Sequence, residues 1–130
     1  MVKNKVNEIL EEVLGIDNDE IQITENSDIF DDLAAESIDL VDICFRLEKD
    51  FGVGKVNPGD IFPAFLQNAE SLDENGNITE NAMERLKSEY PHSKSLINEL
   101  VETKDLRTFF KVKNIVQFVS YRLGESQNGN

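Results

Sequence analysis

The chain has 130 residues, of which 26 are acidic and 13 are basic, so its formal net charge is −13. This length suits one domain with an insertion or a tail. Nucleic acids and anionic membrane surfaces bind basic patches, so the charge argues against both as partners. The acid is concentrated early, because residues 1–60 hold 16 acidic and 5 basic side chains, against 10 and 8 in residues 61–130. The first half therefore predicts a surface that meets a basic partner.

Several classes of protein are excluded by what the chain lacks. It has no apolar run near the ~18 residues of a membrane span, so no membrane insertion is expected. One cysteine, Cys44, cannot form an internal disulfide framework, and together with the one histidine, His92, it leaves too few ligands for a metal site. We expect a monomer in the reducing cytoplasm, with no metal.

The first predicted element is a helix from about Lys3 to Leu14, with Gly15 as its C-cap. Its apolar residues recur at helical spacing: Val6, Ile9, Leu10, Val13 and Leu14. A polar loop follows over residues 16–31. It is long for a compact domain, and long loops are often functional.

The second predicted helix runs from about Ser37 to Asp50 and carries two apolar stripes side by side. One stripe is formed by Leu40, Ile43, Cys44, Leu47 and Phe51; the other is formed by Ile38, Val41 and Phe45. Two stripes are wider than a surface helix needs. Two interpretations are open: the helix is buried on two sides, or the second stripe meets a ligand or partner.

The second half predicts further helices and no convincing strand, so the fold class is all-α. A short helix is expected near residues 60–66, and a longer one begins after Thr79 as N-cap and stops at Pro91. Two more follow at about residues 95–101 and 111–123. We expect the small and polar residues 124–130 to form a disordered tail.

The strongest local feature is Ser37, which begins the second helix among Glu36, Asp39 and Asp42. The plain interpretation is a serine N-cap with acids favoured by the helix dipole. A catalytic serine is disfavoured, because nothing places His92 nearby as a base and the carboxylates would repel an oxyanion. A covalent phosphoryl link is chemically reasonable, because the free N–H groups of a helix N-terminus stabilise a phosphate.

On these residues the chain resembles the acyl carrier protein family. Members of that family typically read Asp-Leu-Gly-Ala-Asp-Ser-Leu-Asp, and residues 32–39 here read Asp-Leu-Ala-Ala-Glu-Ser-Ile-Asp. The other similar pieces are the opening helix Val6–Leu14, the Leu-Gly-Ile of residues 14–16, the Leu-Glu-Lys-Asp-Phe-Gly of residues 47–52, and a last helix over residues 110–119. Two departures stand out: Ala34 replaces Gly and Glu36 replaces Asp. We expect neither position to need a positive φ.

The resemblance implies a carrier and no enzyme, in an acyl-carrier-type four-helix bundle. A phosphopantetheinyl transferase would attach 4′-phosphopantetheine from coenzyme A to Ser37, and acyl chains for fatty-acid or specialised lipid or polyketide biosynthesis would be held on it as thioesters. Acyl-processing enzymes with basic patches would be the other partners. The residues that would meet these partners are Glu36, Ile38, Asp39, Val41, Asp42, Phe45 and Glu48. The alternative is a non-carrier acidic interaction module in which Ser37 is only a helix N-cap.

The resemblance leaves residues 62–105 unaccounted for, as an insertion before the last helix. Its many apolar residues predict extra helices packed into a single domain over residues 1–123, and we expect it to reshape an acyl pocket or add a partner surface. Residues 73–78 are similar to the centre of a calcium loop, but the chain lacks its acidic positions one and twelve, so an Asn-Gly turn is favoured. Cys44 is predicted in the core and His92 in a surface loop.

Overall fold

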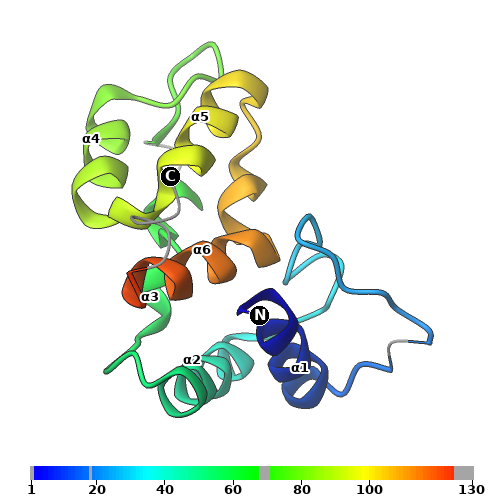
Figure 1. The fold of residues 1–130 in the computed structure, drawn as a ribbon. Helices are drawn as coiled ribbons and strands as arrows, with labels where there is room; N and C mark the ends of the chain where they lie inside the picture. Colours follow the sequence, from blue (N-terminus) through cyan, green and yellow to red (C-terminus); the bar gives the residue numbers. More distant parts are fainter. Residues whose placement is uncertain (1, 18, 68–70, 125–130) are drawn as a thin grey trace.

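Six α-helices and three short 3₁₀ segments make up the regular structure of this computed structural model, which describes residues 2–17, 19–67 and 71–124 (Figure 1). The helices are α1 Val2–Leu14, α2 Ser37–Phe51, α3 Pro58–Ile61, α4 Glu80–Glu89, α5 Lys94–Thr103 and α6 Val112–Arg122. The 3₁₀ segments are η1 Ala64–Gln67, η3 Pro91–Ser93 and η4 Leu106–Phe110.

The predicted all-α class is confirmed. Over the described ranges no strand forms, and β-pairing is limited to two isolated bridges, Asp28 with Lys111 and Leu72 with Ile78. No helix in this part of the chain is long and apolar enough to span a membrane. The predicted disordered tail lies outside the described residues, except for Gly124.

The helix ends follow local chemistry that the sequence carries. Gly52 closes α2 in the left-handed conformation with φ +64°, and its N–H donates to the carbonyl of Glu48 at 3.0 Å. Thr79 caps α4, because its Oγ1 accepts from the Ala82 N–H at 3.2 Å. The cap at Thr79 agrees with the sequence prediction, since threonine satisfies a free N–H of the first turn, and Gly52 suits its position because glycine tolerates positive φ.

Helix α6 lies between two parts of the molecule (Figure 1). On one side it contacts α1, which packs against α2; on the other it contacts η3 and η4, which pack against α4 and α5. The short helix α3 also contacts both α2 and α6. The last helix therefore contacts α1, α3, η3 and η4 directly and joins the two parts of the molecule.

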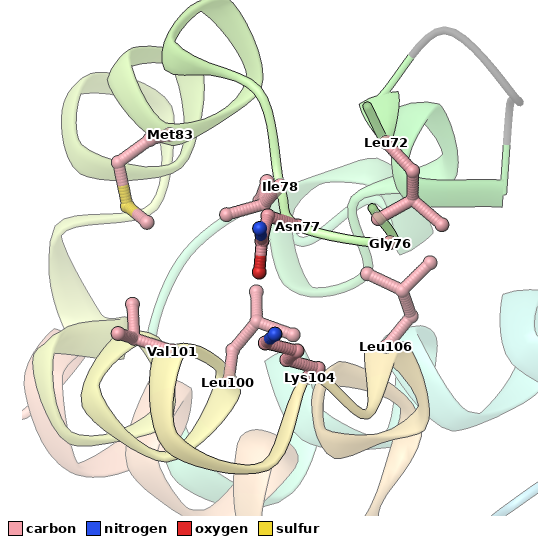
Figure 2. A pocket seen from close by; sticks show the side chains of 9 residues that line it. All are labelled: Leu72, Gly76, Asn77, Ile78, Met83, Leu100, Val101, Lys104 and Leu106. Atoms are coloured by element: carbon pink, nitrogen blue, oxygen red, sulfur yellow. The ribbon is translucent and has the colours of Figure 1, made fainter. Parts of the chain in front are cut away.

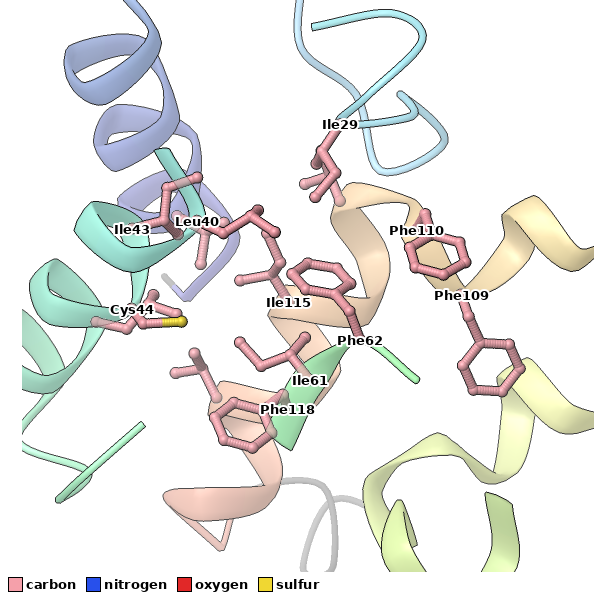
Figure 3. Close-up of a cluster of buried hydrophobic side chains, with 14 of the residues drawn as sticks. Ile29, Leu40, Ile43, Cys44, Ile61, Phe62, Phe109, Phe110, Ile115 and Phe118 are labelled. Atoms are coloured by element: carbon pink, nitrogen blue, oxygen red, sulfur yellow. The ribbon is translucent and has the colours of Figure 1, made fainter. Parts of the chain in front are cut away.

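The core follows α6 from one part to the other (Figure 3). Side chains of α2, among them Leu40, Ile43 and Cys44, face Ile115 of α6, and all four are buried. Beyond them, three aromatic rings join the loop before α2 to the segments around α3 and η4; ring centroids lie 5.8 to 6.5 Å apart in the trio Phe30, Phe62 and Phe110. Burial, aided by nearby carboxylates, raises the pKa of Cys44 to about 12.

The prediction that His92 lies in a surface loop is wrong. His92 is only 8% exposed, and its Nε2 lies 2.9 Å from Oδ1 of the buried Asn114 on α6. The ring of Phe118 meets the imidazole edge-on at 5.2 Å between centroids. Pro91 ends α4 as expected, but the chain then turns inward through η3, so the next residue enters the core.

Candidate functional site

The loop that leads to Ser37 is organised by the carboxylate of Asp28. Its Oδ1 accepts hydrogen bonds from the N–H groups of Phe30 and Asp31 at 2.8 and 2.9 Å, while Asp32 Oδ2 accepts from the Asp28 N–H at 2.8 Å. The loop is fastened to the segment before α6, because the Ile29 N–H donates to the carbonyl of Phe110 at 3.0 Å. Sequence reasoning missed Asp28, although an Asp that bonds N–H groups two and three residues onward is a known turn former.

Ala34 adopts a left-handed backbone conformation with φ +58°, in contrast to our expectation that this position needs no positive φ. The resemblance already carried the signal, because the family has glycine at this position. A Cβ group in this region costs roughly 1–2 kcal/mol, so the alanine is strained. The chain must turn sharply here, because the Ala35 N–H donates to the carbonyl of Ile29 at 2.9 Å just before α2 begins.

Ser37 is the first residue of α2 and is exposed; the N-cap is Glu36. The alternative in which Ser37 is the N-cap is therefore wrong on this point. Asp39 Oδ2 accepts the Glu36 N–H at 2.8 Å, which directs this carboxylate toward the backbone. Among the described residues, the Ser37 hydroxyl and the N–H groups of Ser37 and Ile38 have no hydrogen-bond partner. The hydroxyl is thus free and stands at the positive end of the helix dipole.

The second apolar stripe of α2 faces solvent. Ile38 is 76% exposed, and Val41 and Phe45 are each 60% exposed, whereas the first stripe is buried against the core except for Phe51, which is partly buried. Of the two interpretations left open by the sequence, burial on two sides is wrong. Large apolar side chains gathered next to one another at the surface are typical of an interaction site.

Acidic side chains border this exposed stripe. Glu36, Asp39 and Asp42 lie within five residues of Ser37 at the start of α2. Glu36 and Asp42 are exposed, and Asp39 is partly buried. Glu48 differs from them, because it is partly buried and its Oε2 accepts the Val56 N–H at 2.8 Å. Its carboxylate thus already has a role inside the chain.

The predicted Asn-Gly turn forms at Gly76, which has φ +81°. Asp73 Oδ1 accepts the N–H groups of Asn75 and Asn77 at 2.9 and 3.0 Å, so this carboxylate serves its own loop. No group of three or more His, Cys, Asp or Glu side chains that could hold a metal occurs within the described residues.

Comparison with known proteins identifies the class of this site. A family model described as "Phosphopantetheine attachment site" matches residues 4–72, more than half of the chain. The acyl carrier protein of Thermotoga maritima is 47% identical over 58 residues, which cover 45% of this chain and 68% of that protein. The acyl carrier protein of Clostridium acetobutylicum is 42% identical over 53 residues, 41% of this chain and 66% of that protein.

The chain belongs to the acyl carrier protein family, and its prosthetic group is covalently bound 4′-phosphopantetheine. The family match ends at residue 72, so α4, α5 and α6 lie beyond it. No solved structure matches the chain significantly.

The residues at the start of α2 fit this group. An exposed hydroxyl is open to modification, and the unpaired N–H groups of Ser37 and Ile38 favour an anionic phosphate. The carboxylate of Asp39 is negatively charged and would repel the phosphate, but its Oδ2 accepts the Glu36 N–H. The helix start therefore offers a free hydroxyl and two free donors.

Proposed function

We propose that this chain is an acyl carrier whose attachment point is Ser37 Oγ. The observation that carries the proposal is the exposed, unpartnered Ser37 hydroxyl at the first residue of α2, inside the family match. A phosphopantetheinyl transferase moves the group from coenzyme A onto this oxygen: the bond from Ser37 Oγ to phosphorus forms, the pyrophosphate bond of coenzyme A breaks, adenosine 3′,5′-bisphosphate leaves, and the hydroxyl gives up its proton. When bound, the group supplies a thiol that holds an acyl chain as a thioester. Ser37 anchors the group and catalyses nothing.

The partner enzymes, in this proposal, dock on the start of α2. Ile38, Val41 and Phe45 form an apolar centre, and an apolar centre anchors a contact better than rim charge. Glu36, Asp39 and Asp42 surround it and attract basic patches, which speeds encounter. Glu48 contributes less to this rim than the sequence predicted, because its carboxylate is engaged by Val56.

The pathway is proposed to be a specialised one in lipid or polyketide biosynthesis, with general fatty-acid synthesis as the other possibility. Support comes from residues 62–105, which we propose form an insertion within a single domain over residues 1–123. Helix α6 separates α4 and α5 from α2 (Figure 1). Of the two roles expected for the insertion, an added partner surface is therefore favoured over a reshaped acyl pocket near Ser37.

Intact-mass measurement after incubation with coenzyme A and a broad-specificity transferase tests the attachment point. The wild-type chain should gain one phosphopantetheine, and Ser37→Ala should gain none. Ser88→Ala is the matched control, because Ser88 is another exposed serine on a helix, and it should be modified like the wild type. If several different transferases leave the wild-type mass unchanged, the non-carrier alternative is favoured.

A further inference from the structure

A hollow of about 280 Å³ lies between the turn at residues 72–78 and helix α5 (Figure 2). Helices α4 and α5, which contribute to its lining, lie on the side of α6 away from α2 (Figure 1), and every lining residue except Leu72 lies beyond the family match. The site is therefore separate from the proposed attachment point. Its apolar lining comes from four segments of the chain: Leu72, Ile78, Met83, Leu100, Val101 and Leu106.

One wall of the hollow is a fixed turn. Leu72 pairs with Ile78 in an antiparallel bridge, and the Thr79 N–H donates to the Ser71 carbonyl at 2.9 Å. Asp73 accepts the Asn77 N–H with its carboxylate, and the Asp73 N–H donates to the Asn77 carbonyl at 2.8 Å. These bonds hold the backbone on both sides of the turn, so Asn77 and Ile78 present their side chains from a set position.

The other wall is the last turn of α5, which ends in an unusual residue. Lys104 is the C-cap and has φ +59°, in the left-handed region where glycine is the usual residue, and its N–H donates to the Leu100 carbonyl at 2.7 Å. A lysine is strained here, because its Cβ crowds the backbone in the left-handed region. The side chain of Lys104 also lines the hollow.

Two polar groups face the apolar lining from opposite walls. Figure 2 shows the ammonium of Lys104 and the amide of Asn77 directed toward the same space. Lys104 forms no ion pair with any other described residue, and the carboxylate of the neighbouring Asp105 is engaged by Arg107 at 3.1 Å. An apolar hollow with one cation and one amide at its edge is the usual composition of a site for an amphipathic small molecule.

We propose that this hollow binds a free fatty acid. The alkyl chain lies against the apolar lining, and the carboxylate meets the ammonium of Lys104 and the amide of Asn77. Val101 is 55% exposed and leaves an open side through which such a ligand enters. The charge of the lysine selects a free carboxylate over an acyl thioester, which has no charge at that end of the chain. The carrier would thereby sense free acid at a site apart from Ser37.

An NMR titration of the full ¹⁵N-labelled chain with hexanoate, octanoate and decanoate tests the proposal. We expect saturable shifts at the amides of Asn77, Val101 and Lys104. Affinity should rise about fourfold per added methylene, because each buried methylene contributes about 0.8 kcal/mol. Decanol, which has the same alkyl length without the charge, should bind roughly three- to tenfold more weakly than decanoate.

Two variants separate the charge from the hollow. Lys104→Gln should abolish the preference for decanoate over decanol and keep decanol binding, while Lys94→Gln, an exposed lysine of the same helix outside this hollow, should behave like the wild type. Val101→Trp should fill the hollow and weaken both ligands, without unfolding the chain because Val101 is exposed. Shifts centred on α2 and α6, an unchanged preference in Lys104→Gln, or no saturable shifts would overturn the proposal.

Discussion

Nε2 of His92 and Oδ1 of Asn114 lie 2.9 Å apart in the interior, and this contact joins η3 to α6. The Asn114 amide also donates to the carbonyls of Ile61 and Phe109, at 2.8 and 2.7 Å. One side chain therefore connects α3, η3, η4 and α6. All three of these hydrogen bonds are buried.

Replacing Asn114 should be among the most destabilising single changes in the chain. Asn114→Leu keeps the number and branching of the side-chain heavy atoms but removes the hydrogen-bond partner of two carbonyls and of the imidazole nitrogen, so the free energy of unfolding should fall by about 3 kcal/mol or more. Urea unfolding followed by circular dichroism measures it. Asn98→Leu, at an exposed position of α5, should change it by no more than about 0.5 kcal/mol. A loss below about 1 kcal/mol at Asn114 would contradict this role.

Stability should fall as the pH drops from about 7 toward 5, in part because of His92. Burial lowers the pKa of His92 below its ordinary value near 6.5, Arg122 adds to this, and the hydrogen bond with Asn114 opposes it. The unfolded chain then binds a proton at a pH where the folded chain does not, so protonation favours unfolding. Glu99 and Asp105 have lowered pKa values and lose their contributions at a lower pH.

The contribution of His92 is isolated by comparing the pH dependence of unfolding in the wild type and in His92→Gln. The variant should show a shallower decline between about pH 7 and pH 5, because the carboxylates contribute equally to both proteins. NMR titration of the imidazole gives the pKa directly. A value above 6.5 would mean that burial does not dominate at this residue.

Ala34→Gly should stabilise the chain. Ala34 has φ +58°, a conformation that glycine adopts without the Cβ penalty, so we expect a gain of about 1 kcal/mol in the free energy of unfolding. Ala35→Gly is the matched control: Ala35 is buried and has no positive φ, so the same change should cost about 1 kcal/mol. Opposite signs at adjacent alanines are the expected outcome, and equal losses at both would argue against strain at Ala34.

The exposed stripe of α2 should matter for modification and not for folding. Phe45→Ala should leave the unfolding free energy within about 0.5 kcal/mol of the wild type, because the side chain is 60% exposed. The kcat/KM of the transferase on this chain should fall about tenfold, and added salt should lower the wild-type value by screening the acidic rim. Val101→Ala, an exposed apolar residue on α5, should leave the rate unchanged.

The features that repeat along the sequence were the ones that could be predicted. Periodic apolar positions gave α1 and α2 within a residue of their ends, and Thr79 marked the start of α4. The exposure of Phe45 could not be predicted, because the spacing of apolar residues is the same in a stripe that packs against the core and in one that binds a partner. Only the arrangement of α1 and α6 around α2 decides between these.

Single residues with special environments gave no periodic signal. His92 follows a proline, and only the course of η3 carries it to Asn114, which is 22 positions onward. The backbone of Ala34 could have been predicted from the glycine that the family has there. Asp28 is one of many acidic residues in the first half, so its burial is not evident from composition.

The position of α6 also sets the order in which the chain can fold during synthesis. Helix α1 packs against both α2 and α6, and the ribosome makes α6 more than 60 residues after the end of α2. Until α6 emerges, the nascent chain has helices but no completed core, and contacts between such distant segments slow folding. A nascent chain that stalls before residue 112 should thus remain sensitive to protease, although every element of the family match has already been made.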